Sequence, residues 1–490
     1  MITLPVSLEC GRLVRVFWGG AEFAITLLTG VEGGGNFTHT GQQVSTTGQS
    51  SPWGRAIRSA EVVPRRSGTI GACDGQQSQR RHGGDSMSVP LNATEALEHL
   101  KSDPGAGTAE AYGEVLGQCP MARVKIAGSD VDWWGALGYA ELTAVLRDFR
   151  KMSSTVTTEP DGTPAILPLF ADPPLHTGFR KLLNPNFPPE VVGRLEAGNR
   201  EIAVAMIDAL VAATEADFST QFTFPYPTRV LCRFLGVPDS DWPFHHEFVM
   251  AVGEQVGFAV NDQQDEQLFV EAMGKILPYV QKVIEDHREN PRDDIVNSFV
   301  TGQVQGRELT DPEISKLIIA MMLAGHGTTT AALSNTVLRL ARDQELQSLL
   351  RAEPHRIPDA IEESLRIDTP QQTLSRKCIA DTEIAGEKIA AGEFVLTSYG
   401  SANVDPRRFP DPGKFDLDRE DKNHLAFGFG LHACLGQHFA RMNMRITLEE
   451  LLARTSSFSV NGEVKRRSFP VLSVDEMPLA LRAAGSANAQ

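Results

Sequence analysis

The sequence predicts a mainly α-helical domain with small β-sheets. Apolar residues recur with helical spacing in most segments from residue 91 onward, whereas segments that alternate like β-strands are few and short. Hydrophobic residues make up 41% of the chain and charged residues 22%, the balance of a soluble globular protein. A length of 490 residues would suit about three domains of ordinary size, but no linker interrupts the chain after residue 87. We therefore expect one large domain over residues 87–490.

The first 86 residues differ from the rest in composition. They hold eight Arg, no Lys and six acidic residues, a net charge of +2 in a chain whose total is −16, which leaves −18 for the remainder. They are rich in Gly, Ser, Thr and Gln and show no sustained helical or strand period. Two interpretations stay open for this N-terminal extension: a flexible tail, or upstream sequence joined to a chain whose translation starts at Met87. We assign it no function.

Charge, hydropathy and cysteine spacing exclude several classes of protein. A net charge of −16 argues against a nucleic-acid partner. No run of 18 or more apolar residues occurs, so the sequence predicts no membrane-spanning helix. The cysteines have no paired spacing, which indicates the reducing cytoplasm rather than a disulfide framework. They are Cys10, Cys73, Cys119, Cys232, Cys378 and Cys434. We expect a soluble cytoplasmic protein.

The first elements of the domain are a strand pair and a helix. Residues 124–126 and 132–134 alternate like the two strands of a hairpin. Residues 140–149 then predict a helix, because Leu142, Val145 and Leu146 fall on one apolar stripe.

Late in the chain, a helix beginning near Pro358 must stop before Pro370, because a proline disfavours helical conformation in the residue before it. Residues 383–386 and 393–396 then predict a second strand pair, turned by the glycines that lie between and beside them, Gly386 and Gly392.

A long helix is predicted to begin near Thr310. Thr310 and Glu313 have the spacing of a capping box, with Pro312 in the first turn. The helix then meets residues 324–330, Ala-Gly-His-Gly-Thr-Thr-Thr, in which each glycine costs about 1 kcal/mol relative to alanine. A weak patch inside a buried helix suits a local widening, or π-bulge, at a functional site. The alternative is a set of small residues that allow close helix packing.

Two pairs of charged residues have helical spacing. His176 and Arg180 share one helix face at i,i+4, behind the prolines at 173–174 that suit a helix entrance. Two donors one turn apart suit a pair of carboxylates, although such a pair is ordinarily part of a solvated face. Glu363 and Arg366, at i,i+3, can form an ion pair.

The most informative stretch is residues 427–436, Phe-Gly-Phe-Gly-Leu-His-Ala-Cys-Leu-Gly, which places Cys434 in a tight loop. Backbone amides in such a loop can point at the sulfur and hold it as a thiolate. A zinc site of His432, Cys434 and His438 is disfavoured, because no second Cys/His pair with ligand spacing lies nearby. Three glycines allow positive φ and close approach of the backbone to a flat ligand: Gly428, Gly430 and Gly436.

This stretch resembles the cysteine-loop signature of the cytochrome P-450 family at every defined position. The resemblance covers about residues 119–481 and implies that family's fold, a triangular helical prism around a buried haem b. It implies that Cys434 is the axial ligand of the haem iron, a thiolate that favours O–O cleavage, and that Phe427 packs on the sulfur side of the ring. The residues it implies as holders of the haem propionates are His176, Arg180, Arg376 and His432.

The resemblance also assigns roles to the helical motifs. Residues 324–330 lie over the distal face of the haem, where Thr328, with Ala324 and Gly325, shapes oxygen activation. The chain departs from the family at Gly327, where an acid is usual, so proton delivery must run through water, His326, another side chain or the substrate.

In the family the pair formed here by Glu363 and Arg366 is buried and structural, with a third partner from a later loop. Arg408 and His424 are both candidates for that partner. On the helix after the cysteine loop, docking of a partner and a solvated face are equal alternatives for three residues: His438, Arg441 and Arg445.

The resemblance implies a haem-thiolate monooxygenase, which inserts one atom of O₂ into a small organic substrate. The chain carries no nucleotide fingerprint and no flavin domain. We therefore expect a monomer that receives electrons from a separate ferredoxin or flavodoxin with its reductase, so that NAD(P)H acts only through these partners. The alternatives are a peroxide-driven peroxygenase, suggested by Gly327, and a non-enzymatic haem or gas sensor. The substrate is not readable from the sequence.

Overall fold

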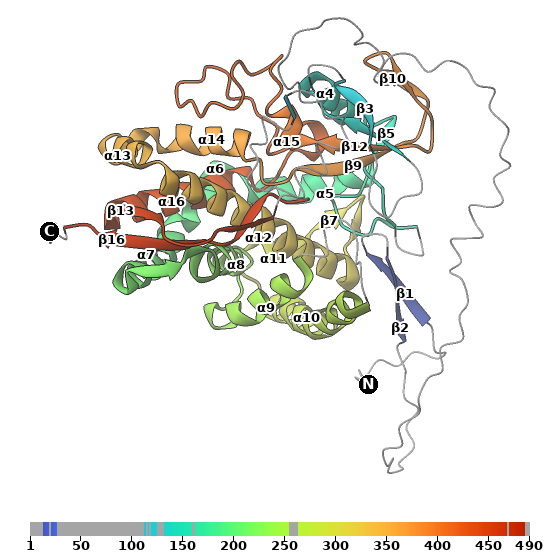
Figure 1. Ribbon diagram of the computed structural model, residues 1–490. Helices are drawn as coiled ribbons and strands as arrows, with labels where there is room; N and C mark the ends of the chain where they lie inside the picture. The colour runs from blue at the N-terminus through green and yellow to red at the C-terminus, as the bar shows by residue number, and fades with distance from the viewer. Residues whose placement is uncertain are drawn as a thin grey trace, which may run out of the picture. The chain divides into compact units, whose positions relative to one another are not determined.

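Among residues 87–490, those that the structure describes are mainly helical, with small sheets beside the helices (Figure 1). The computed structural model describes residues 13–18, 21–26, 112–113, 116, 119–124, 132–158, 162–253, 263–467 and 470–485, and the backbone alone at 13–18, 21–26, 253 and 263–266. The chain divides into two units, Met1–Val14 with Ala24–Ser86 and Arg15–Phe23 with Met87–Gln490, and each is described by itself.

Two strands lie within the first 86 residues. Strands β1 (Leu13–Trp18) and β2 (Ala21–Thr26) form a two-stranded sheet. The extension has no sustained strand period, but the Gly-Gly step at 19–20 between two apolar runs is a local hairpin signal. The other residues of the extension, and Met87, lie outside the described residues.

The largest sheet has five strands and brings distant segments together. Strands β3 and β4 pair antiparallel, which confirms the predicted hairpin, although residues 125–131 lie outside the described residues. Strand β4 pairs parallel with β12, and β12 antiparallel with β9. The spatial order is β3 (Met121–Val124), β4 (Trp133–Ala136), β12 (Phe394–Ser398), β9 (Thr373–Cys378) and β5 (Met152–Ser153).

Two predicted helices form close to their expected bounds. Helix α4 (Tyr139–Arg147) ends two residues earlier than predicted, and its buried residues include Leu142, Val145 and Leu146. Helix α14 (Ile357–Ile367) ends before Pro370, as the proline requires.

The second predicted strand pair is wrong. Strand β10 (Thr382–Ile384) pairs with β11 (Glu387–Ile389), not with residues 393–396. Ala385 and Gly386, with φ of 52° and 84°, form a two-residue turn that reverses the chain at once. Such turns match the twist of a hairpin, so the strand after Gly386 pairs first. The predicted strand at 393–396 becomes β12 of the larger sheet instead.

Helix α12 (Asp311–Arg342) runs between the other helices and contacts α8, α9, α10, α14 and α16. The predicted capping box at Thr310 is confirmed, since its hydroxyl accepts from the Glu313 amide while the Glu313 carboxylate accepts from the Thr310 amide. Among the described residues, α12 is the one helix long and apolar enough to span a membrane, but 67% of its apolar window is buried inside the protein. It is therefore a core helix here.

The predicted π-bulge at 324–330 is wrong, because α12 stays α-helical through this segment. The alternative, close packing, holds at Gly325, where an added Cβ would lie 2.8 Å from the Leu231 side chain. The π-helical turn lies next to it instead, at Ser219–Thr223, and the Thr330 hydroxyl donates to the Thr223 carbonyl at 2.9 Å.

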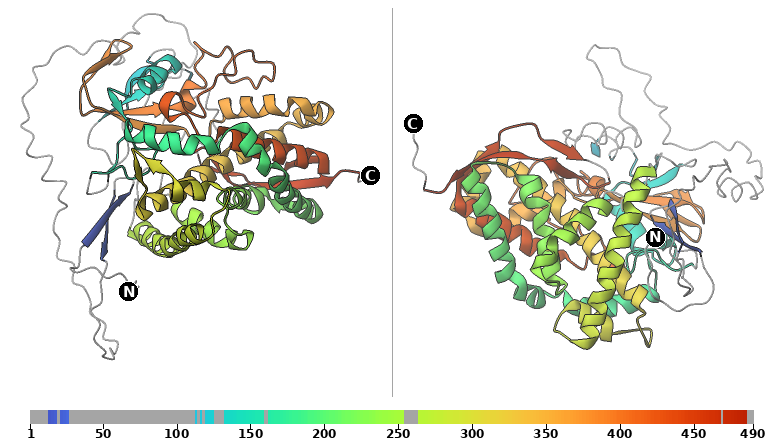
Figure 2. Two further views of the ribbon diagram at one scale, coloured as in Figure 1. Left: turned by 180° about the vertical axis from the view of Figure 1, so that it is seen from behind. Right: turned by 90° about the horizontal axis from the view of Figure 1, so that it is seen from below.

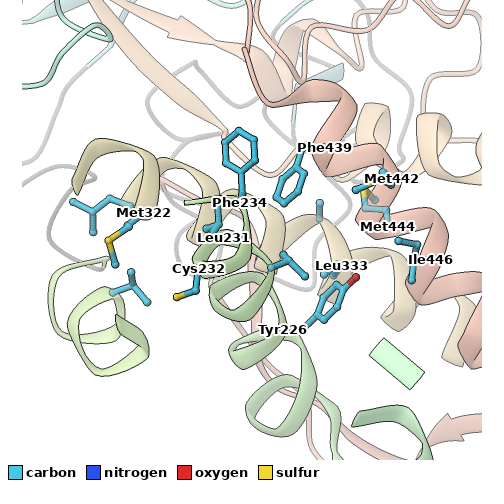
Figure 3. Close-up of a cluster of buried hydrophobic side chains, with 14 of the residues drawn as sticks. Tyr226, Leu231, Cys232, Phe234, Met322, Leu333, Phe439, Met442, Met444 and Ile446 are labelled. Carbon is cyan, nitrogen blue, oxygen red and sulfur yellow. The ribbon is translucent and has the colours of Figure 1, made fainter. Parts of the chain in front are cut away.

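Side chains of α8 (Pro225–Phe234), α12 and α16 (Gln437–Arg454) meet in the core (Figure 3). The rings of Phe234 and Phe439 pack at a tilt of 34°, with 5.2 Å between their centroids. Tyr226 is fully buried, and its hydroxyl donates to Asn443 Oδ1 at 3.1 Å, so no polar atom of this ring is left unpaired. Each large apolar side chain buried here contributes about 1.5–3 kcal/mol.

The remaining elements complete the scaffold, with α7 packed along α16 (Figure 2). The helices are α5 (Leu175–Leu183), α6 (Pro189–Val192), α7 (Glu196–Ala213), α9 (Trp242–Gly253), α10 (Gln263–Glu289), α11 (Ile295–Thr301), α13 (Gln344–Ala352) and α15 (Tyr399–Ala402). The strands are β6 (Glu215–Asp217), β7 (Gln303–Val304), β8 (Arg307–Glu308), β13 (Thr455–Val460), β14 (Lys465–Arg467), β15 (Ser473–Glu476) and β16 (Pro478–Ala483).

One buried histidine of α9 has no hydrogen-bond partner. His245 is 1% exposed, both of its ring nitrogens lack a partner, and its ring meets the edge of Tyr279 at 4.8 Å. Burial lowers the pKa of His245 to about 4, against the opposing charge of Asp241. Unpaired buried polar atoms cost stability, so this side chain destabilises the packing of α9 on α10.

We expect His245→Phe to stabilise the protein, by about 1–3 kcal/mol, because phenylalanine keeps the aromatic contact and removes the unpaired nitrogens. The gain should be larger in acid. The pKa of His245 is lower in the folded than in the unfolded state. The folding free energy of the wild type is therefore unaffected by this histidine's titration above pH 6.5, and the protein loses stability as the pH falls from 6.5 towards 4. Thermal unfolding between pH 4 and 8 measures this, with the exposed His355→Phe as control. A variant less stable than the wild type at every pH would contradict the interpretation.

Candidate functional site

The loop before α16 places Cys434 by two left-handed glycines. Gly428 and Gly430 have φ of 70° and 71°, and the Cys434 amide donates to the Phe427 carbonyl at 2.8 Å. A Cβ on Gly430 would lie 3.1 Å from a backbone oxygen of α4, so this residue also allows close approach. The expected positive φ at Gly436 is wrong: its φ is −80°, because it caps the N-terminus of α16.

The thiol of Cys434 has accessible surface, yet burial raises its pKa. The two observations agree if the accessible surface faces an internal space rather than bulk water. The Gly436 amide and the cations Arg180 and Arg441 oppose the effect of burial and lower the pKa. An amide and two cations around a sulfur are the surroundings that stabilise a thiolate.

Four predicted donors converge beside this cysteine from three elements. The rings of His176 on α5 and His432 in the cysteine loop lie 4.1 Å apart. Arg180, one turn after His176, donates to the Ala433 carbonyl at 2.8 Å. Arg376 on β9 is 6% exposed and lowers the pKa of both histidines. The sheet, α5 and the loop thus bring together residues that lie up to 256 positions apart.

Mutual repulsion and burial keep the two histidines neutral. The pKa of His432 falls to about 3, first through burial and then through the positive charges of Arg376, His176 and Arg180. The pKa of His176 falls to about 4, through burial and Arg180, with Asp172 opposing. The Asp172 carboxylate is already engaged, since it accepts from the Ser153 hydroxyl and the Ser154 amide.

The donor set fits an anionic group with at least two carboxylates. Nδ1 of His176 is buried without a hydrogen-bond partner. His432 Nε2 contacts the Ser154 hydroxyl at 2.9 Å, and the two arginines add a positive charge each. Haem carries two propionates and an iron that takes a thiolate, so the residues present fit this cofactor.

One face of α12 is accessible although the helix lies in the core. Ala324, Gly325, Gly327 and Thr328 have accessible surface, whereas Met322, Leu323 and His326 around them are buried. The spacing i, i+1, i+3, i+4 defines one helix face, which therefore borders an internal space. The Thr328 hydroxyl donates to the Ala324 carbonyl at 2.9 Å. No atom lies within 4 Å of a Cβ built at Gly327, so there is room beside the hydroxyl.

His326 does not join this face. It is 5% exposed, and its Nε2 contacts the Phe224 carbonyl at 3.0 Å, on the side of α8 and α9. Burial lowers its pKa to about 4, so the ring is neutral near pH 7. Of the proton routes considered for this chain, the one through His326 is therefore not supported by its position.

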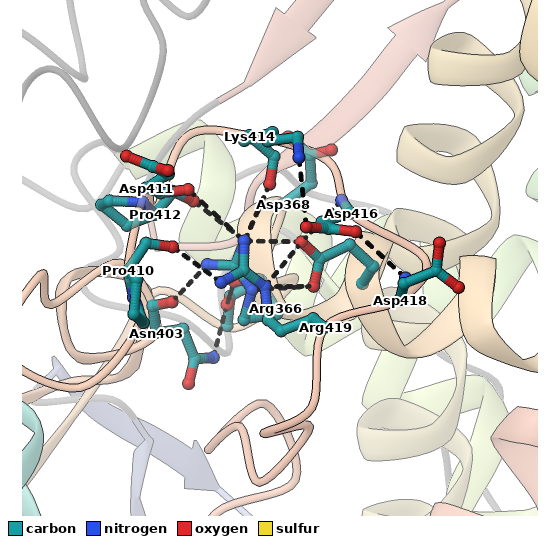
Figure 4. A network of polar contacts seen from close by, with 12 residues as sticks. Arg366, Asp368, Asn403, Pro410, Asp411, Pro412, Lys414, Asp416, Asp418 and Arg419 are labelled. Carbon is teal, nitrogen blue, oxygen red and sulfur yellow. Dashed lines mark hydrogen bonds and ion pairs between the residues drawn. The ribbon is translucent and has the colours of Figure 1, made fainter.

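Glu363 and Arg366 form the predicted ion pair, at 2.8 Å, with side-chain exposures of 3% and 1% (Figure 4). The third partner is Arg419, whose Nε donates to both Glu363 oxygens at 3.0 and 3.2 Å. Both candidates from the sequence are wrong: Arg408 binds Asp421, and His424 binds Glu362.

The two guanidinium groups also hold the loop that follows. Arg366 donates to the carbonyls of Asn403 and Pro412, and Arg419 to those of Pro410 and Lys414 (Figure 4). The buried charges are therefore paired and fully hydrogen-bonded, which is the condition for tolerating them in a protein interior.

Two of the three basic residues expected after the cysteine loop are engaged within the protein. Arg441 forms two hydrogen bonds to Glu362 and lies over the Phe427 ring at 4.3 Å. Arg445 pairs with Glu196 at 2.8 Å and Glu449 at 3.1 Å. His438 is exposed.

Most of the chain, including the cysteine loop and α12, is similar to known proteins. Residues 256–470 match the family model described as Cytochrome P450. Cytochrome P450-terp of Pseudomonas sp is 31% identical over 368 residues, 70% of this chain and 86% of that protein. Mycinamicin IV hydroxylase/epoxidase of Micromonospora griseorubida is 33% identical over 361 residues, 71% and 88% of the two chains. The crystal structure of CYP108D1 from Novosphingobium aromaticivorans aligns with a TM-score of 0.70 at 31% identity, covering 81% of this chain and 100% of that one.

We expect Arg419→Gln to destabilise the protein by about 3–5 kcal/mol, because it leaves the buried Glu363 carboxylate with one cation instead of two. Arg408→Gln is the matched control. Its guanidinium pairs with Asp421 at 39% exposure, where an ion pair contributes about 1 kcal/mol at most. Denaturant unfolding of both variants measures the difference. Equal losses would show that Arg419 is not part of the supporting network.

Proposed function

The chain belongs to the cytochrome P450 family, and we propose that Cys434 and the four donors beside it hold haem b. The protein is accordingly a haem-containing oxidoreductase, a monooxygenase acting on an organic substrate. The observation that carries the proposal is the convergence of His176, Arg180, Arg376 and His432 next to the one cysteine of the loop. When bound, haem supplies the redox-active iron that activates O₂.

Each side chain of the site has a separate task in this proposal. The two arginines and the two histidines bind the propionates and so fix the ring against the loop. Phe427 packs on the sulfur side, and the loop glycines Gly428, Gly430 and Gly436 give the backbone room. Glu363 and Arg366 act on structure alone, by fixing the loop that leads to the cysteine.

In this proposal Thr328, on the accessible face of α12, holds a proton at its Oγ1. The Ala324 carbonyl accepts from that hydroxyl, Gly327 leaves space beside it, and Gly325 allows the Leu231 side chain of α8 to pack closely on α12. A water in the space beside Gly327 would connect the hydroxyl to solvent without a carboxylate. Thr328 is thus the proposed donor in the oxygen-activating step, although the acid is missing.

The chain has no redox domain of its own among its recognisable motifs, so we propose a ferredoxin or flavodoxin, with its reductase, as the electron source. NAD(P)H then acts only through these partners. We further propose that residues 87–490 form the catalytic domain, that the protein is a cytoplasmic monomer, and that residues 1–86 contribute nothing to the site. One of the named relatives is a hydroxylase/epoxidase, which favours this reaction over a peroxide-driven enzyme or a gas sensor.

Cys434→Ser tests the proposal directly. We expect the variant to fold and to lose the thiolate-type absorption band in the difference spectrum of the reduced protein with carbon monoxide, because a serine hydroxyl is not a thiolate donor. Cys378→Ser, a buried cysteine on β9, is the control and should keep the band. A thiolate-type band that survives in Cys434→Ser would refute the assignment.

Thr328→Ala should divert electrons to peroxide. Loss of the hydroxyl removes the proposed proton donor, so we expect product per nicotinamide consumed to fall by about tenfold or more. Thr329→Ala, on the buried side of α12, is the control. Gly327→Asp should change coupling less than Thr328→Ala does, since space is available at this position. Product and peroxide are measured together. Full coupling in Thr328→Ala would mean that the substrate or another side chain relays the proton.

Lys181 on α5 is a better candidate than Arg445 for the contact that docks the electron-donating partner. The charge of Arg445 is already neutralised by Glu196 and Glu449. We expect Lys181→Gln to slow reduction by roughly two- to fivefold at low salt, because local positive charge steers an acidic partner to a chain of net charge −16. Arg445→Gln serves as the control and should leave the rate and its salt slope unchanged. The rate is followed against ionic strength. If Lys181→Gln behaves like the control, the partner docks elsewhere.

A further inference from the structure

A charged cavity lies at the C-terminal end of α12, apart from the site described above. Its volume is about 190 Å³, far more than the roughly 10–15 Å³ that one water molecule needs. Within the described part of the chain, its charged and polar lining comes from the end of α12, the end of α14 and strand β14. These residues are Asn335, Arg339, Arg342, Asp343, Asp368 and Arg466.

Arg466 is a half-buried cation without a partner. Its Nε is buried and makes no hydrogen bond, and none of the described residues forms an ion pair with its guanidinium. Burial lowers the pKa of Arg466, Asp368 opposes this, and the nearby Arg342 and Arg339 lower it further. Because a guanidinium stays charged in proteins, this is a positive charge without a direct ion-pair partner among the described residues.

The two aspartates of the cavity are already engaged. The Asp368 carboxylate accepts from Arg339 Nε at 3.0 Å and from its Nη2 at 2.5 Å. Asp343 Oδ1 accepts from the Leu346 amide at 2.8 Å, as the N-cap of α13.

Three arginines against two aspartates leave a charge of +1 around the cavity. Arg339 and Arg342 lie in the last turn of α12, where cations compensate the helix dipole. That explanation does not cover Arg466, which comes from a strand.

A buried acceptor without a partner lies on a residue beside the cavity. Asn335 is 3% exposed, and its Nδ2 donates to the carbonyls of Leu472 at 2.8 Å and Asp368 at 3.3 Å, which fixes the orientation of the amide. Its Oδ1 is buried and has no partner. Because this oxygen has no accessible surface, a ligand in the cavity contacts Arg342 and Arg466 instead and carries negative oxygens for them.

We propose that this arginine cavity binds a phosphate group, either inorganic phosphate or the end of a small phosphate monoester. Both are anions at neutral pH, with negative oxygens that two guanidinium groups can bind. The bound group would bridge Arg342 of α12 and Arg466 of β14, next to the Asp368 at the end of α14. Such a bridge ties the C-terminal strands to the central helix, so its effect is on stability.

The test uses the full chain with its haem, in chloride buffers of constant ionic strength. Inorganic phosphate, glycerol phosphate and sulfate are titrated, with the heat of binding and the Tm as readouts. We expect saturable binding of phosphate and a Tm that rises with the logarithm of its concentration. Sulfate, a tetrahedral dianion that the same guanidinium groups can bind, should compete with phosphate for the cavity. Glycerol phosphate distinguishes the two possible ligands. If it binds as tightly as inorganic phosphate, the cavity also accepts monoesters; if it does not bind, the ligand is the inorganic ion.

The variants separate binding from folding. Arg466→Gln should abolish the response to phosphate, yet without phosphate its Tm should equal or exceed that of the wild type, because an unpaired buried charge is gone. Arg342→Gln, an exposed position, should weaken binding about tenfold. Arg467→Gln is the matched control, because its guanidinium binds Asp475 at 2.9 Å one residue further along β14. No saturable response in the wild type, or a full response in Arg466→Gln, would overturn the proposal.

Discussion

Positive charge inside the protein, beside Cys434, is the constraint on which the rest of the site depends. Arg180, Arg376 and two histidines are brought together from α5, β9 and the cysteine loop, and burial, assisted by repulsion among them, keeps the histidines neutral. Without an anion these charges would oppose folding. Under the proposed function, an anionic cofactor would offset these charges, so its binding would also stabilise the fold of this region.

A second set of buried charges makes that arrangement rigid. Glu363 accepts from both Arg366 and Arg419, and the spare donors of the two arginines bind carbonyls across residues 403–414. This network fixes the long irregular stretch that leads to the cysteine loop, where there is little regular secondary structure to do so. Beside Cys434 and around Glu363, a few charged side chains therefore fix the backbone where regular helices and strands are lacking.

Local signals predicted the parts of the site that lie within one turn. The helix positions of His176 and Arg180, the Glu363–Arg366 pair and the capping box at Thr310 follow from spacing alone. The convergence of α5, β9 and the loop came from the family resemblance, not from spacing. Arg419 was missed because it lies 56 residues from Glu363 in an aperiodic loop, and no periodic pattern connects the two. The π-helical turn was predicted on α12 but lies at residues 219–223, since glycines in a helix indicate close packing as readily as a distortion. Local patterns do not distinguish these outcomes.

The central claim is that the four donors hold the carboxylates of the cofactor. The most direct measurement compares the affinity of the haem-free protein for haem and for its dimethyl ester, in which both carboxylates are neutral. The account predicts that the wild type prefers the free acid by about tenfold or more, and that Arg376→Gln loses much of this preference, because each charge-assisted bond is worth about 1.5–3 kcal/mol. Equal affinity of the wild type for haem and its ester would contradict the account.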